Sequence, residues 1–149
     1  MNWTKDRSIA LSIVCVYVFA AILLAADIFC FRLTGWFAVI RNMSRQQGVG
    51  MMATVYVCSV FAWVVLFCLW RLLNNIRRGE VFVAQNVRFM RLVSWCCAGV
   101  CAACLVSMLW YLPFVFVAVA AGFMALIVRI VKNAFQQAID MKDELDLTI

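Results

Sequence analysis

The stretch between Arg91 and Arg129 constrains the fold of this chain more than any other feature. It contains 37 consecutive residues without a charge. As a single helix it would measure about 55 Å, well beyond the ~30 Å hydrocarbon core of a bilayer, so it must fold back on itself. Residues 110–113, Trp-Tyr-Leu-Pro, suit the turn, because aromatic rings favour the membrane interface and proline is accepted at the first position of a helix. We predict membrane spans over residues 92–110 and 113–131.

Two further apolar runs precede this stretch, over residues 8–31 and 51–70. The chain of 149 residues is 68% hydrophobic and only 13% charged, whereas a soluble domain has about 25% charged residues. The first run is longer than the ~7–15-residue core of a signal peptide and lacks a small-residue cleavage site, so we expect it to remain as a span. The predicted fold is all-α: a single membrane domain over residues 1–149, with four transmembrane helices in an antiparallel bundle.

Basic residues are unevenly divided between the two sides of such a protein. Four spans place both termini, the loop 71–91 and the tail 132–149 on one side. That side collects ten lysines and arginines, while the other has three. Because the loops of membrane proteins that are rich in lysine and arginine stay in the cytoplasm, we predict that the termini and this loop are cytoplasmic.

The spans contain few groups that could carry chemistry. Asp27 is the only acid within them, and its place near the outer end of the first run favours a structural anchor over an ion site, with Arg32 or a neighbouring helix as its partner. The eight cysteines lie in or beside apolar runs, where reduced cysteine packs as a small hydrophobe. Cys101 and Cys104 form a CxxC pair, but the chain has no histidine, so we expect neither a metal site nor a cofactor.

The central loop and the tail differ in charge. Residues 71–91 include five arginines and one acid, Glu80, while four of the chain's seven acids lie in its last ten residues. We expect the second helix to end near Gly79, the next to begin at Ala84 or Gln85, and the last to continue into the tail with one apolar face. That face is formed by Val131, Ala134, Ala138, Met141 and Leu145. Two alternatives stay open for the loop arginines: contact with a partner, or attraction to anionic lipid alone, at about 1 kcal/mol each.

Two short segments are specific enough to suggest a family. They are residues 75–82 (Asn-Ile-Arg-Arg-Gly-Glu-Val-Phe) followed by Asn86, Val87, Arg88 and Arg91, and residues 144–149 (Glu-Leu-Asp-Leu-Thr-Ile). Both segments resemble the bacterial domain-of-unknown-function 2975 proteins. The chain departs from that family at Val83 and Gln85, where Thr and Glu are frequent, so the helix after the loop lacks an evident N-cap.

The resemblance implies a four-span protein of the bacterial cytoplasmic (inner) membrane with no established activity. Members of the family are often encoded beside a small helix-turn-helix regulator of the Cro/CI type. We therefore expect a non-enzymatic regulatory membrane protein whose loop and tail dock a soluble partner, with such a regulator as the candidate. The residues expected to bind the partner are Arg77, Arg78, Glu80, Arg88, Arg91, Leu145, Asp146, Leu147, Thr148 and Ile149.

Other classes of function have less support. An enzyme is not expected, because the chain has no histidine, no cluster of intramembrane acids and no nucleophile beside a base. Direct DNA binding is not expected of a short loop held close to lipid. The alternative is a small transporter or channel subunit, which would need a homo-oligomer to form a pore and has Asp27 as its one intramembrane acid.

Overall fold

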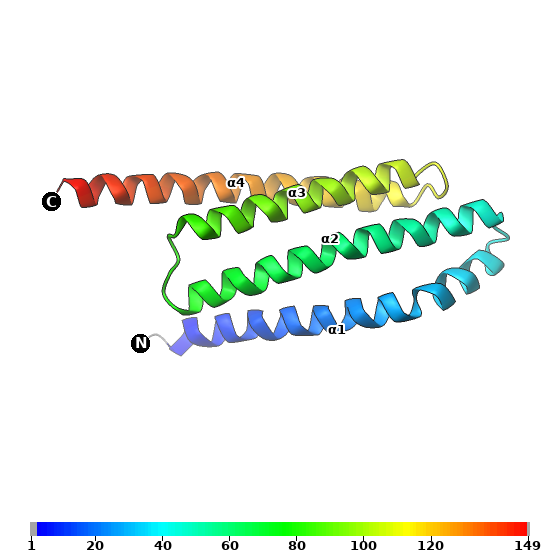
Figure 1. Ribbon diagram of the computed structural model, residues 1–149, viewed down its shortest axis with the longest axis horizontal. Coiled ribbons are helices and arrows are strands. Elements are labelled where there is room, and N and C mark those ends of the chain that lie inside the picture. The colour runs from blue at the N-terminus through cyan, green and yellow to red at the C-terminus, as the bar shows by residue number, and fades with distance from the viewer. Residues whose placement is uncertain (1–2, 149) are drawn as a thin grey trace.

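The chain folds into four long helices, with no strand among the residues that the structure describes. This structure is a computed structural model, which describes residues 3–148, with side chains over residues 7–148. The helices are α1 (Trp3–Ile40), α2 (Arg45–Arg77), α3 (Ala84–Ser107) and α4 (Phe114–Leu147). All four are long and apolar enough to cross a membrane (Figure 1). The prediction of an all-α protein with four spans is confirmed.

Both ends of the described chain lie at the same end of the molecule as the α2–α3 loop (Figure 1). We call this the terminal end, and the opposite end, with the α1–α2 and α3–α4 turns, the distal end. The helices exceed the predicted apolar runs: α1 has 38 residues and α4 has 34, so each is longer than 50 Å at about 1.5 Å per residue. At the terminal end, α4 continues past the ends of α2 and α3 (Figure 1).

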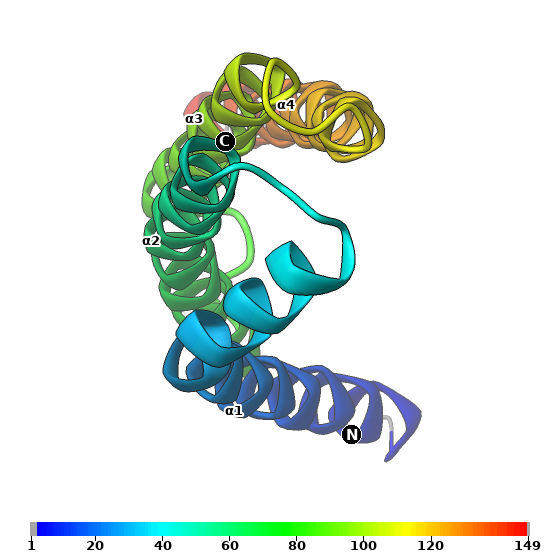
Figure 2. The same ribbon diagram turned by 90° about the vertical axis from the view of Figure 1, so that its right-hand side faces the viewer.

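The helices are arranged as an open, curved layer. Among the described residues, each helix packs along its length only against its neighbours in sequence, so α1 has no helix-to-helix packing with α3 or α4. Figure 2 shows α1 and α4 at the two edges of the layer. The predicted antiparallel order is therefore right, but the bundle does not close around a central core. Hydrocarbon can cover apolar helix faces as well as another helix does, so membrane spans need not close.

The turns at the distal end have defined caps. At the start of α2, Ser44 Oγ accepts a hydrogen bond from the backbone N–H of Gln47 (3.3 Å), and Gln47 Oε1 accepts one from the backbone N–H of Ser44 (3.0 Å). This reciprocal pair is a capping box. The α3–α4 turn falls at the predicted break, with Pro113 directly before α4. Tyr111 in this turn meets the ring of Phe37 edge-on at 5.7 Å, so the turn closes against α1.

The α2–α3 interface combines polar contacts with close packing. The hydroxyls of Thr54 and Ser107 lie 2.5 Å apart, and one turn further along, the sulfurs of Cys58 and Cys104 lie 3.8 Å apart. Gly99 lies in the same interface, further from the distal end. A Cβ at this position would come within 2.8 Å of the Phe61 ring. The two helices therefore approach closely because α3 has no side chain at this position.

Replacing Gly99 by valine should destabilise the protein. The added side chain would push Phe61 out of its place, and overpacking of this kind costs about 1–3 kcal/mol. The measurement is the midpoint of thermal unfolding in detergent. Gly35→Val is the matched control, because it adds the same side chain to a helix at a position with no neighbour within 4 Å. Equal losses in the two variants would show that helix propensity, and not the contact with Phe61, causes the effect.

Candidate functional site

The loop at the terminal end begins with a tight helix C-terminus. Gly79 has a φ of 83°, in the left-handed region that glycine adopts without strain. Its N–H donates to the carbonyl of Ile76 (3.0 Å), and the N–H of Glu80 donates to the carbonyl of Asn75 (3.0 Å). These two bonds form a Schellman motif. The predicted end of the second helix near Gly79 is confirmed, and α3 begins at Ala84 as predicted.

Asn86 holds the loop from inside. Its side chain is completely buried (0% exposed), and its Nδ2 donates to the carbonyls of Glu80 and Val81, each at 2.9 Å. Its Oδ1 accepts a hydrogen bond from Asn75 Nδ2 at 2.8 Å. Val83 precedes α3 without a side-chain cap hydrogen bond, so the start of this helix is fixed through the loop that Asn86 holds. They also tie the end of α2 to the start of α3.

Sequence reasoning did not select Asn75 or Asn86 as functional residues. The signal was nonetheless present, because both are uncharged polar residues at the ends of otherwise apolar helices and both belong to the motif quoted above. The charged arginines were the predicted site residues instead. The arginines shape the surface of the loop, whereas the two asparagines determine its conformation.

The loop contacts the tail. The rings of Phe82 in the loop and Phe135 in α4 have centroids 5.9 Å apart with a tilt of 34°. One turn beyond Phe135, Ile139 is buried, with 9% of its surface exposed. The base of the tail helix is thus fixed to the loop by apolar packing. Charge pairing contributes nothing here, since within residues 71–148 no side-chain carboxylate lies within 4.0 Å of a lysine or arginine nitrogen.

The apolar face predicted for the tail is not the face that packs inward. The packed side is formed by Val128, Lys132, Phe135 and Ile139, which are half-buried or buried. On the predicted face, Ala138 is half-buried, but Met141 is 53% exposed and Leu145 is 67% exposed. The helix continues to Leu147. An apolar surface therefore extends beyond the loop without any cover from the described chain.

The residues expected to bind a partner lie on several surfaces. Arg77 lines a cavity of about 390 Å³ beside α1. Arg78, Glu80 and Arg88 are exposed around the loop, and Arg91 lies at the mouth of a groove between α3 and α4. In the tail, Leu145, Asp146, Leu147 and Thr148 are exposed, while Ile149 lies outside the described residues. The base of α4 is the only connection between the exposed loop residues (Arg78, Glu80 and Arg88) and the described end of the tail.

Asp27 forms hydrogen bonds with the neighbouring helix α2. Its Oδ1 accepts a hydrogen bond from Ser59 Oγ (2.5 Å) and its Oδ2 accepts one from Trp63 Nε1 (3.0 Å). Both donors lie in the middle of the apolar run 51–70, and α1 continues to Ile40, beyond residue 31 where the first span was predicted to end. The partner is a neighbouring helix, which was one of the two predicted partners; the other, Arg32, is not bonded to Asp27.

Asp27 has no further acid, histidine or cysteine arranged around it as a metal site would require. Among the described residues, no group of three or more such side chains could hold a metal ion. The carboxylate instead joins α1 to α2 through the hydrogen bonds from Ser59 and Trp63. An acid within an apolar span is a candidate for function as well as for structure.

The fold and the loop define a class: a four-span helical membrane protein with a closed loop and a projecting tail at one end. Residues 11–149 match the family described as protein of unknown function (DUF2975). The match covers nearly the whole chain, and the chain belongs to this family. No curated protein and no solved structure matches it.

Replacing Asn86 by alanine should open the loop. The change removes three hydrogen bonds of about 1 kcal/mol each, so trypsin should cleave after Arg77 and Arg78 roughly 10- to 100-fold faster. The measurement is the rate of limited proteolysis in detergent. Asn74→Ala is the control, because the Asn74 side chain makes no hydrogen bond in the described structure. If both variants are cut at the wild-type rate, Asn86 does not hold the loop.

Proposed function

We propose that this protein is a non-enzymatic regulatory protein of the bacterial inner membrane. Its terminal end faces the cytoplasm, in agreement with the excess of basic residues there. The loop and the tail form a docking site for a soluble protein. The candidate partner is a small helix-turn-helix regulator, which the family resemblance suggests.

The projecting tail of α4 carries this proposal. From Phe135, where the loop packs, to Leu147 at its end, α4 extends by about 18 Å at 1.5 Å per residue. Met141, Leu145 and Leu147 are exposed along this length. Met141 and Leu145 are four residues apart and share one face, and an amphipathic helix with an uncovered apolar face is the form that fits into a groove on a partner. The helical form at residues 145–147 favours this mode over addition of a strand.

The negative charge of the tail indicates that the partner's binding surface is basic. Four acids accompany the apolar residues at its end: Asp140, Asp143, Glu144 and Asp146. Within the described residues none of them pairs with a basic side chain of this chain. A groove with a basic rim would complement them and speed the encounter. The DNA-binding face of a regulator is basic for the same electrostatic reason, so the tail would compete with DNA for it.

Truncation after Lys142 should abolish partner binding. The shortened chain keeps the loop and the packed base of α4 but lacks Leu145 and Leu147. The measurement is a pull-down from the native host in mild detergent, with an N-terminal tag, for both chain lengths. We expect a helix-turn-helix protein with the full-length chain only. Recovery of the same partners by both chains would contradict a docking role for the tail.

The loop can be tested in the same pull-down with Arg77→Gln/Arg78→Gln. Both side chains are exposed, so the variant should insert and unfold like the wild-type protein while it recovers less partner. If it fails to insert in the membrane, the arginines serve topology and not docking. Binding equal to that of the wild type would limit the site to the tail.

The position of Asp27 within an apolar span favours a second candidate, a small oligomeric transporter or channel subunit. If Asp27 lies on an ion path, Asp27→Asn should reduce H⁺ or K⁺ flux in proteoliposomes at least about tenfold, because the charged group in the membrane is lost. Glu80→Gln, which removes an acid outside the spans, is the control. Flux that is absent from the wild type or unchanged in Asp27→Asn would leave Asp27 as a structural link between α1 and α2.

A further inference from the structure

A groove of about 490 Å³ lies between α3 and α4. Its walls along the spans combine the small residues Ala98, Ala102 and Gly122 with Leu105 and Leu126. The helices stay together at its base, because Ser94 Oγ donates a hydrogen bond to the carbonyl of Ala125 (3.0 Å) and because a Cβ on Gly122 would meet Cys101 Sγ at 3.3 Å. The groove is thus a depression on the surface of two helices that pack against each other at its base.

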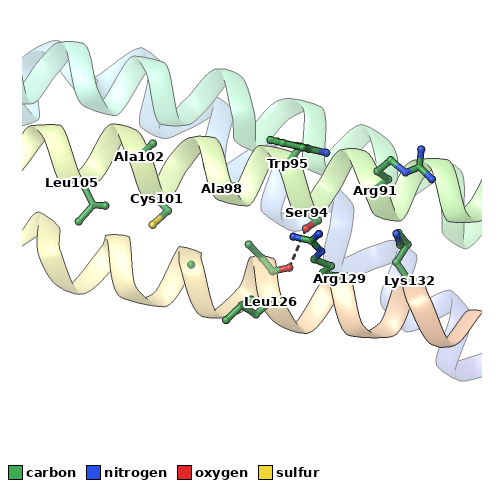
Figure 3. Close-up of a pocket in the computed structure, with 12 residues that line it drawn as sticks. Arg91, Ser94, Trp95, Ala98, Cys101, Ala102, Leu105, Leu126, Arg129 and Lys132 are labelled. Atoms are coloured by element: carbon green, nitrogen blue, oxygen red, sulfur yellow. Dashed lines mark hydrogen bonds between the residues drawn. The ribbon is translucent and has the colours of Figure 1, made fainter.

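Three basic side chains gather at the terminal end of this groove. Arg91 comes from α3, and Arg129 and Lys132 come from α4, where their spacing of three places them on one face. Figure 3 shows the three at one end of the groove and Leu105 at the other. The lining includes no acid, and within residues 71–148 none of the three pairs with a carboxylate. Three uncompensated positive charges therefore surround the mouth of an apolar hollow.

Two features indicate that this mouth lies at the level of the membrane surface. Trp95 lies one turn from Arg91, lines the groove and is 72% exposed, and tryptophan is enriched where hydrocarbon meets the headgroups. Arg91 and Arg129 also bound the charge-free stretch of 37 residues. A ligand in the groove would thus have its charged part among headgroups and its remainder among acyl chains.

We propose that the α3–α4 groove binds one anionic phospholipid. Arg91, Arg129 and Lys132 hold the phosphate, and an acyl chain lies along the apolar wall. Basic pockets between transmembrane helices are a known setting for anionic headgroups. A free phosphate would use only the mouth and leave the apolar hollow unexplained, so the occupant is a lipid. The inference does not depend on partner docking, since the groove lies on a different face of α4 from Met141 and Leu145.

Native mass spectrometry of the purified protein in a neutral detergent tests this site. Phosphatidylglycerol and phosphatidylcholine with identical palmitoyl and oleoyl chains are titrated separately. We expect the wild type to retain one phosphatidylglycerol and to discriminate against phosphatidylcholine. Arg129→Gln/Lys132→Gln should lower the affinity for phosphatidylglycerol about 30-fold, given roughly 1 kcal/mol for each lost charge.

Two further variants identify the cause of any change. Arg78→Gln/Arg88→Gln removes the same charge from exposed positions outside the groove and should keep the affinity within about threefold, because separated exposed charges are screened. Ala98→Leu/Ala102→Leu fills the hollow at two exposed positions and should also reduce retention of phosphatidylglycerol, with all three basic side chains in place. Thermal unfolding confirms that each variant is folded.

Several results would overturn the proposal. Equal loss in the two charge variants would assign binding to net charge, and equal retention of the two lipids would show an ordinary lipid-facing surface. Displacement of phosphatidylglycerol by excess inorganic phosphate, or unchanged retention in Ala98→Leu/Ala102→Leu, would show that no acyl chain occupies the groove. Because the purified protein is used alone, these outcomes are independent of partner docking.

Discussion

Hydrocarbon as the surrounding solvent is the constraint on which this structure depends. In a bilayer the backbone must satisfy its own hydrogen bonds, so a chain this apolar becomes helices. Lipid covers apolar side chains at little cost, so the helices are free to form an open layer in which α1 and α4 do not meet. What orders neighbouring helices is then a small set of polar links and close contacts, such as Asp27 with Ser59 and Gly99 with Phe61.

The parts of this fold that could be predicted follow from length and polarity. The charge-free stretch after Arg91 is too long for one span and contains a single proline, so the turn before α4 could be located. Gly79 could be identified as a helix end because few other residues adopt a positive φ without strain. The open arrangement could not be predicted, because lipid-facing and helix-facing positions are equally apolar here and leave little periodicity to read.

The partners of Asp27 and the role of Asn86 needed the structure for different reasons. Asp27 could be assigned to an apolar run, but its bonds to Ser59 and Trp63 depend on how α1 packs against α2. Asn86 makes its hydrogen bonds to the carbonyls of Glu80 and Val81 and to the amide of Asn75. Spacing in sequence does not reveal such a convergence. The arginines were predictable as a group, but the structure distributes them over different surfaces.

Helix α4 joins the two proposed sites through its continuous backbone. Lys132 lines the groove, and Phe135, less than one turn further, packs against the loop. A lipid that reoriented Lys132 would act on the segment from which the tail projects. Thermodynamic linkage is reciprocal, so if lipid and partner affect each other through α4, the partner must change the affinity for lipid by the same factor as the lipid changes the affinity for partner. The contact between Phe82 and Phe135 is the element whose packing would have to differ between the two states.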